Sequence, residues 1–209
     1  MVSIAAPPPA NAPSPILLTL PQTSEIMRIY DPAKHGMHAL SFRNFGPLHR
    51  FDHHRHPASA PDVDNDRAIL YGGFTLSCCI VEVFGDTGII EPGTKWAAIL
   101  SLQRPLNLLD LRGTGAMRAG TVAAVSKEAD RNVTQAWARY FYDNEGIYGT
   151  IDGLIFFNAH NDEEAVALFE RAENALLLPP GNTIELGDPA MRTELQHIAI
   201  RNNLLVPPS

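Results

Sequence analysis

The chain has 209 residues, of which 45% are hydrophobic, and its formal net charge is −7. A chain of this length and composition can bury a sizeable core, so we expect one globular domain that needs neither disulfides nor a structural metal. The negative charge argues against binding to nucleic acid or to an anionic membrane, so any recognition of phosphate must be local.

Three sequence features bear on the compartment. The two cysteines, Cys78 and Cys79, are adjacent and cannot form a disulfide framework, which favours the cytoplasm. No apolar run reaches the roughly 20 residues of a membrane span. The first 22 residues lack the basic start of a signal peptide and are interrupted by prolines, so they predict a flexible arm before a single domain over residues 23–209.

The strands are predicted from short apolar or alternating runs that end at glycine, proline or polar residues. Residues 37–67 form a polar loop that is unusually long for a connection, and such loops in compact domains are usually functional. Strands are expected at residues 25–30, 68–71, 96–102, 106–111, 153–157 and 183–186.

The helices are predicted from apolar residues at helical spacing. One is expected to begin at Asn161 or Asp162, with Ala165, Leu168 and Phe169 on one face. Others are expected at residues 74–84, 113–126 and 133–143 and after Asp188-Pro189, with Leu195 and Ile198 facing inward in the last. Strands and helices do not alternate strictly, so we expect an α+β fold with a mixed sheet flanked by helices.

A positive segment stands out within the acidic chain. Between Leu40 and Pro57 the charged residues are Arg43, Arg50, Arg55 and a single acid, Asp52. Guanidinium groups can hold a pyrophosphate through paired hydrogen bonds, although they can equally pair with acids such as Asp62 and Asp64.

Four histidines, at positions 49, 53, 54 and 56, add to this segment. Adjacent imidazoles on an extended loop diverge, and no zinc-binding spacing accompanies them, so we expect solvated histidines and no metal. A metal-dependent hydrolase that uses the His53 loop remains an alternative.

Two further residues suit a site for an anionic, aromatic ligand. Tyr71 at a strand end can stack on a flat ring, although such a tyrosine is more often an edge of the core. Glu82 lies on the side of the 74–84 helix away from the deepest core, where it can stabilise a cation on a sugar carbon or simply face solvent. The nucleophile elbow of hydrolases, the phosphate-binding loop of nucleotidases and the dinucleotide-binding glycine motif are all absent from the sequence.

The order of these residues resembles the RES-domain family, which includes bacterial NAD-degrading toxins. Arg50-Phe51-x-x-x-Arg55-x-Pro57 is similar to the family's Arg-Phe-Gly-Gly-Arg-Trp-Asn-Pro segment, and Tyr71 and Glu82 have the family's spacing of eleven. Arg28 resembles an early arginine of the family. Residues 134–137 and 152–154 resemble later landmarks, so the resemblance covers about residues 26–175.

The resemblance implies a fold related to ADP-ribosyltransferases and cleavage of the nicotinamide–ribose bond of NAD, as a phosphorylase or a glycohydrolase. NAD would be the substrate, inorganic phosphate a co-substrate, and an antitoxin or a second copy of the chain a partner. Arg55, with Arg28 and Arg50, would hold phosphate groups, Tyr71 would pack on nicotinamide or its ribose, and Glu82 would stabilise the cationic ribose.

Two departures from the family pattern leave an alternative open. Asp52-His53-His54 replaces the Gly-Gly between the two arginines, which makes the loop bulkier. The family serine has Ser126 as its nearest candidate, while Asn158 stands where many relatives carry serine. If the serine is lost, the chain is a nucleotide-binding or partner-binding module without turnover.

Overall fold

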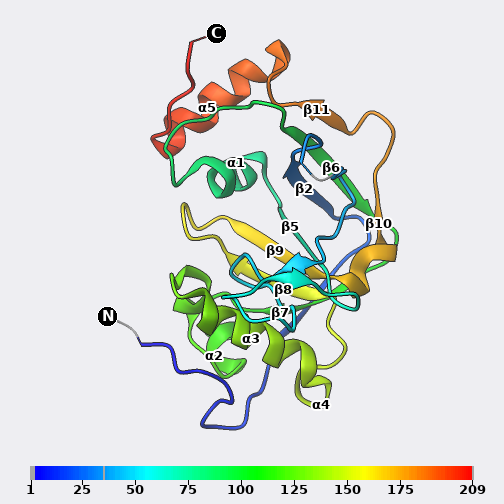
Figure 1. Cartoon of the computed structure of the whole chain (residues 1–209), viewed down its shortest axis with the longest axis vertical. Coiled ribbons are helices and arrows are strands. Elements are labelled where there is room, and N and C mark those ends of the chain that lie inside the picture. The colour runs from blue at the N-terminus through cyan, green and yellow to red at the C-terminus, as the bar shows by residue number, and fades with distance from the viewer. Residues whose placement is uncertain (1–2, 35, 209) are drawn as a thin grey trace.

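The protein is described by a computed structural model that covers residues 3–34 and 36–208. In this part of the chain nine strands form one sheet, in the order β1-β7-β8-β9-β5-β2-β6-β10, with β11 also paired to β6 (Figure 1). β7 and β8 run parallel, and the other pairs are antiparallel. The strands are β1 (Leu17–Leu20), β2 (Glu25–Tyr30), β5 (Ile69–Gly73), β6 (Trp96–Leu102), β7 (Leu106–Asp110), β8 (Gly153–Phe157), β9 (Glu164–Phe169), β10 (Leu176–Leu177) and β11 (Thr183–Glu185).

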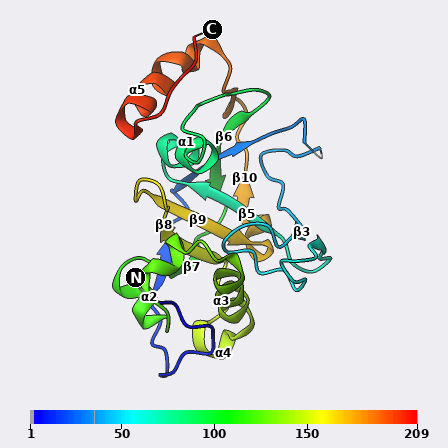
Figure 2. The same cartoon turned by 60° about the vertical axis from the view of Figure 1, so that its left-hand side comes forward.

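The helices form two groups at opposite ends of the molecule, as two views 60° apart show (Figures 1 and 2). α1 (Leu76–Phe84) and α5 (Arg192–Asn202) lie at one end, and α2 (Thr114–Arg118), α3 (Arg131–Asp143) and α4 (Glu145–Tyr148) lie at the other. Short 3-10 segments are η1 (Ala123–Lys127), η2 (Glu170–Ala175) and η3 (Pro189–Met191), and β3 (Phe45–Gly46) pairs with β4 (Asp62–Val63) in the long loop. The mixed sheet with flanking helices confirms the expected α+β fold. Within the described residues, no helix is both long enough and apolar enough to cross a membrane.

α1 forms for reasons that can be read in its sequence. The Thr75 hydroxyl caps the helix by accepting the N–H of Cys78 at 2.9 Å. Ile80 and Phe84 pack in one apolar cluster with Leu195 and Ile198 of α5. The helix therefore presents its other side, which carries the exposed Glu82, to the surface.

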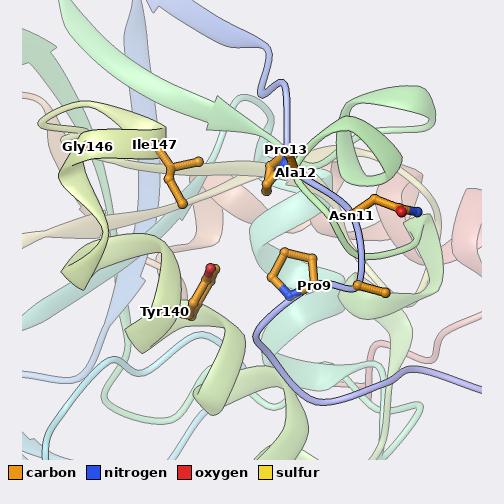
Figure 3. A pocket seen from close by; sticks show the side chains of 8 residues that line it. Pro9, Asn11, Ala12, Pro13, Tyr140, Gly146 and Ile147 are labelled. Carbon is orange, nitrogen blue, oxygen red and sulfur yellow. The ribbon is translucent and has the colours of Figure 1, made fainter.

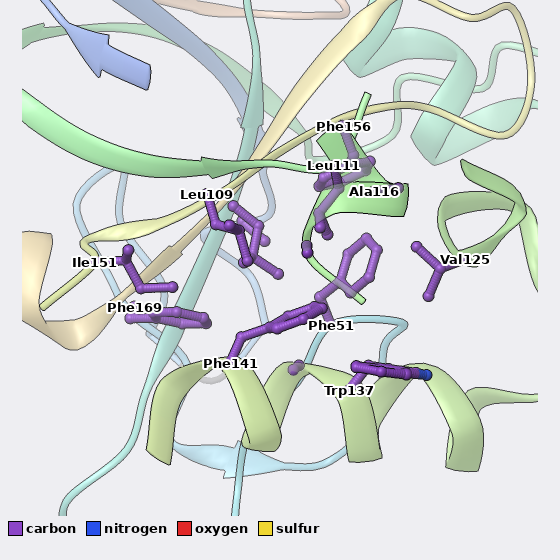
Figure 4. Packing of buried hydrophobic residues seen from close by; sticks show 14 of the residues in the cluster. Phe51, Leu109, Leu111, Ala116, Val125, Trp137, Phe141, Ile151, Phe156 and Phe169 are labelled. Carbon is purple, nitrogen blue, oxygen red and sulfur yellow. The ribbon is translucent and has the colours of Figure 1, made fainter. Parts of the chain in front are cut away.

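An aromatic core anchors the long loop to the sheet. Phe51 is fully buried among Trp137 and Phe141 of α3 and Phe156 of β8 (Figure 4), and its ring centroid is 4.8 Å from that of Phe156. Burial of such a ring contributes about 1.5–3 kcal/mol. The loop segment next to Arg50 is therefore fixed by packing.

The predicted helix after Asn161 is wrong. Residues Glu164–Phe169 form β9, a central strand between β8 and β5, and all but Glu164 are buried. A strand covered on both faces reads as a continuous apolar run, so the helical spacing from Ala165 to Ala172 was a coincidence. The helix expected over residues 113–126 is also shorter, since α2 and η1 replace it.

The proline-rich segment lies along the body of the molecule. The indole N–H of Trp137 donates to the carbonyl of Ala5 at 2.8 Å, and Ser14 bonds to Arg118. β1 then pairs with β7 over four residues, within the segment for which the sequence predicts a flexible arm. A shallow pocket between this segment and α3 and α4 is lined by Pro9, Ala10, Asn11, Ala12, Pro13, Tyr140, Gly146 and Ile147 (Figure 3) and contains none of the predicted site residues.

Candidate functional site

Three of the predicted site residues come together between α1 and the start of α3. The charge of Glu82 acts on Arg50, and Arg50 also lies within the electrostatic reach of Tyr71. Arg50 comes from the long loop, Tyr71 from β5 and Glu82 from α1, so the fold joins residues that are up to 32 positions apart. The structure therefore places the Glu82 carboxylate within electrostatic reach of the Arg50 guanidinium, and the backbone next to Arg50 bonds to Tyr71 through the N–H of Phe51.

Glu82 is exposed to solvent, yet its carboxyl group is crowded by neighbouring atoms. This desolvation raises the pKa of Glu82 above its ordinary value, although the charges of His160 and Arg50 and the backbone N–H of Ala159 oppose the rise. A carboxylate that is partly removed from water acts more strongly on a nearby cation than one in bulk solvent. Glu82 is thus suited to stabilise positive charge.

One nitrogen of the Arg50 guanidinium is held by the backbone. Its Nη1 donates to the carbonyl of Glu128, just before α3. Arg131, the first residue of α3, adds a second positive charge nearby and donates to the carbonyl of Leu48 at 2.6 Å. Partial burial lowers the pKa of Arg50, which nevertheless stays charged at neutral pH because a guanidinium keeps its proton. The pair of guanidinium groups suits an anionic ligand.

The Tyr71 hydroxyl has two protein partners. It donates to Oδ1 of Asp52 at 2.9 Å and accepts the backbone N–H of Phe51 at 3.0 Å. Burial and the negative charge of Asp52 raise the pKa of Tyr71 well above its ordinary value. The phenol is therefore neutral, and its ring, edge-on to His49 at 5.8 Å, is the part left to meet a ligand.

Asn158 organises the turn beside Glu82. Its side-chain carbonyl accepts the backbone N–H groups of His160 and Asn161, both at 2.9 Å, and its amide donates to Cys78 on α1 at 3.3 Å. Asn158 is fully buried. It therefore holds the turn whose Ala159 N–H bonds to Glu82, and its role toward a ligand stays a prediction.

Ser126 is close in sequence to the backbone group that holds Arg50, and its role toward a ligand stays a prediction. It lies in η1, two residues before the Glu128 carbonyl that accepts Arg50. Ser126 is 3% exposed, and its hydroxyl donates to the carbonyl of Ala123 at 3.3 Å. In this arrangement Ser126 shapes the backbone that receives Arg50.

Arg28 and Arg55 have partners elsewhere. Arg28 is buried and donates to the carbonyls of Ala39 and Ser41 at 2.9 and 2.7 Å, and burial lowers its pKa to about 10. Arg55 is half exposed and forms ion pairs with Asp64 and Asp66. Of the two interpretations that the sequence left open for Arg55, the arrangement matches pairing with local acids, and its role toward a ligand stays a prediction.

The expectation of solvated histidines is wrong at two positions. His53 and His54 are fully buried, although His49 is exposed. His53 lies against Phe169, with ring centroids 4.4 Å apart, and pairs with Glu170 at 2.9 Å. The sequence could not show this because Phe169 and Glu170 are more than a hundred residues away along the chain. Among the described residues no group of three or more histidine, cysteine or acidic side chains is placed to hold a metal ion.

Sequence reasoning missed the residues that arrange the site. Asp52 accepts hydrogen bonds from both Tyr71 and Arg43, and Arg131 stands beside Arg50. Asp52 did carry a signal, since it is the one acid in a positive segment. Nothing in the sequence placed the turn at Ala159 next to Glu82.

Comparisons with known proteins agree with this architecture. The family model described as "RES domain" matches residues 25–187. A chain in the crystal structure of the M. tuberculosis MbcT–MbcA toxin–antitoxin complex has a similar fold, with a TM-score of 0.60 and 16% sequence identity, over 86% of this chain and 92% of that chain. A search of curated proteins finds no match. Because the family model spans well over half of its length, the chain belongs to the RES domain family.

Proposed function

We propose that the protein cleaves the bond between nicotinamide and ribose in NAD and transfers the ADP-ribosyl group to inorganic phosphate or to water. The observation that carries this proposal is that the Glu82 carboxylate acts on Arg50, the residue before Phe51, whose N–H bonds to the Tyr71 hydroxyl. Membership in the RES domain family supports it. An anion-binding group, an aromatic surface and a carboxylate are the three components that an anionic, aromatic and cationic substrate requires.

Glu82 acts on the sugar carbon at which the bond breaks. When the carbon–nitrogen bond breaks, its electron pair leaves with nicotinamide, which becomes neutral, and positive charge develops on the ribose carbon. The negative Glu82 stabilises that charge more in the transition state than in the ground state. An oxygen of phosphate or water then forms the new bond to the same carbon. The product is a phosphorylated ADP-ribose or, after the attacking water has lost a proton to solvent, free ADP-ribose.

Arg50 is the guanidinium that we assign to the phosphate groups. One of its nitrogens bonds to the Glu128 carbonyl, which orients the fork while other N–H donors stay available. Arg131 adds charge beside it. Arg55, proposed for this task from the sequence, would first have to leave Asp64 and Asp66. We therefore assign the phosphate groups to Arg50 first and give Arg55 a lesser part in binding them.

Tyr71 packs on the nicotinamide or its ribose through its ring. Its hydroxyl already donates to Asp52 and accepts from Phe51, so it has no proton to offer the leaving group. Nicotinamide leaves as a neutral molecule and needs no general acid. The position of Tyr71 thus agrees with the chemistry.

A protein partner fits the same picture. The structure with a similar fold is a toxin–antitoxin complex, and we propose that this chain is likewise a toxin-like enzyme of the cytoplasm with an antitoxin partner. Unrestrained NAD consumption inside a cell would be harmful, so an inhibitor is expected. A second copy of the chain is the other partner that we propose.

The second candidate function is a binding module without turnover. Two observations favour it. The Ser126 hydroxyl donates its hydrogen bond to the Ala123 carbonyl, and Arg55 forms ion pairs with Asp64 and Asp66. In that case the pocket would bind NAD or a related nucleotide and leave it intact. The residues that bind are the same in both proposals, and only turnover separates them.

Purified protein incubated with NAD, with and without inorganic phosphate, separates these proposals. Products resolved by mass should contain nicotinamide with a phosphorylated ADP-ribose for a phosphorylase, or with ADP-ribose for a hydrolase. Measurable binding of NAD with the NAD left intact would identify the binding module. Neither binding nor consumption would contradict both.

A further inference from the structure

We propose that Asp52 is the positioning residue of this site, which fixes both the Arg50 loop and the Tyr71 phenol in the geometry that receives the ligand. The proposal rests on the proposed function for the identity of the ligand. Nothing in the sequence pattern assigned a role to Asp52, which stood out only as a lone acid among basic residues.

Asp52 is buried and fully satisfied. Its exposed fraction is 0%, and Nη2 of Arg43 donates to its two carboxylate oxygens at 2.8 and 2.7 Å. Oδ2 also accepts the backbone N–H groups of Leu48 and His49, at 2.5 and 2.9 Å. Oδ1 accepts the Tyr71 hydroxyl. Burial alone would raise the pKa of Asp52, but the charge of Arg43 and these N–H groups outweigh it and lower the pKa below its ordinary value.

These bonds close the chain into a turn from which Arg50 projects. The N–H of Asp52 donates to the carbonyl of His49 at 3.2 Å, so the turn is closed by backbone as well as by the carboxylate. Phe51 anchors it in the core, and its N–H donates to the Tyr71 hydroxyl. Arg50 lies between these fixed residues, so the direction of its side chain depends on the turn.

The Asp52 carboxylate also fixes the orientation of the Tyr71 side chain. Because the hydroxyl donates to Asp52 and accepts from Phe51, the ring is held in one orientation. The charge of Asp52 is balanced by Arg43 at 2.7 Å, whereas Glu82 forms no ion pair with the residues that the structure describes. Asp52 thus shapes the site and does not compete for the cationic substrate.

Asp52→Asn tests this role because it keeps the size and removes the charge. The new NH₂ group cannot accept the N–H groups that now converge on Oδ2, so the turn should open and Arg50 should lose its direction. We expect KM for NAD to rise about tenfold, with a smaller change in kcat, because Arg50 binds a part of the substrate that does not react. In an Arg50→Ala background, Asp52→Asn should raise KM by clearly less than this, because only its effect through Tyr71 then remains.

A matched control variant separates a loss of stability from a loss of positioning. Asp152 is 6% exposed and accepts a paired contact from Arg104 and the N–H of Asn107, but it directly precedes β8, at the opposite end of that strand from the turn that reaches Glu82. Asp152→Asn should lower the melting temperature to a similar extent and leave KM and kcat unchanged. A rise in KM with Asp152→Asn equal to that with Asp52→Asn would overturn the positioning role.

Hydrogen exchange measures the turn without any need for activity. The N–H groups of Leu48, His49 and Phe51 should exchange faster in Asp52→Asn than in the native protein. In Asp152→Asn the same groups should exchange as slowly as in the native protein. Should Asp52→Asn fail to fold, Tyr71→Phe serves instead, since it removes only the hydroxyl and should expose the Phe51 N–H. Unchanged exchange at these residues contradicts the proposal.

The two readouts separate the failure of this proposal from that of the proposed function. If the native protein neither binds nor consumes NAD, the proposed function fails, and the exchange data alone decide whether Asp52 fixes the turn. If NAD is consumed but the KM effects of Asp52→Asn and Arg50→Ala simply multiply, Asp52 does not act through Arg50 and the positioning role fails.

Discussion

Deletion of residues 1–13 should destabilise the protein, which is the opposite of what the proline-rich sequence predicts. The sequence indicates a dispensable arm. In the structure, Ile4 packs on the aromatic core and the carbonyl of Ala5 accepts the indole N–H of Trp137, a residue only 1% exposed. Pro9 lies over Gly120, whose φ of +94° and lack of a side chain allow the close approach. The deletion leaves β1 and its pairing with β7 in place.

The size of the loss follows from these contacts. Trp137 buries about 200 Å², and uncovering about a third of it costs about 1.7 kcal/mol at ~25 cal/mol per Å². The lost hydrogen bond adds about 1 kcal/mol, for a total of about 3 kcal/mol. The entropy regained by the released arm makes this an upper value. For a domain of this size, about 3 kcal/mol corresponds to a fall in melting temperature of about 6–12 °C.

Thermal unfolding followed by circular dichroism measures this effect in the deletion variant and the full-length chain. Trp137→Phe provides the check, because its destabilising effect should be smaller in the deletion variant than in the full-length chain, by about the ~1 kcal/mol of the hydrogen bond to Ala5. A fall in melting temperature below about 2 °C for the deletion would refute the reasoning and restore the sequence-based expectation of a dispensable arm.

Three further predictions concern charge. The acid limb of the activity profile should lie above pH 4.5, because the pKa of Glu82 is raised and the carboxylate must be ionised; Arg50→Ala should move this limb higher still, since the Arg50 charge opposes the rise, and the pH dependence of kcat measures both. Arg50→Ala should weaken NAD binding about tenfold or more in calorimetry, whereas Arg55→Ala should change it less, and the reverse order would return the phosphate role to Arg55. Burial lowers the pKa of His53 below 6.5, so the unfolded chain takes up this proton more readily and the free energy of unfolding should fall as pH drops below 6.5; His53→Gln should flatten that fall in denaturant titrations.

Local patterns were sufficient where short-range physics decides the structure. Thr75 and the apolar spacing after it predict the helix that carries Glu82, and α1 ends at the predicted Phe84. The strands at residues 25–30, 96–102 and 153–157 were also predicted with the observed bounds. The resemblance in motif order identified the family that the comparison shows.

Long-range contacts decide what the sequence could not show. β9 was mistaken for a helix because burial on both faces removes the alternation that marks a strand. His53 was expected in solvent because its partner Glu170 is distant in sequence. For the same reason the arm was not expected to pack, since its contact with Trp137 joins residues 132 positions apart.

The site likewise contains residues that the sequence predicted and a residue whose role it could not show. Arg50, Tyr71 and Glu82 were named from the sequence, and the fold brings them together. Asp52 was seen only as a charge, because its role depends on Arg43, the Tyr71 hydroxyl and two backbone N–H groups that converge on it. Such convergence is a property of the folded chain and leaves no spacing in the sequence.

The rate of nicotinamide release by Glu82→Gln, measured beside NAD affinity, tests the central claim most directly. The substitution keeps the shape of the side chain and removes the negative charge that the cationic transition state requires. We expect kcat to fall about a hundredfold or more while the affinity for NAD stays within about threefold of the native value. A native rate of nicotinamide release in Glu82→Gln would contradict the account, because Glu82 would then be a surface residue without a part in the chemistry.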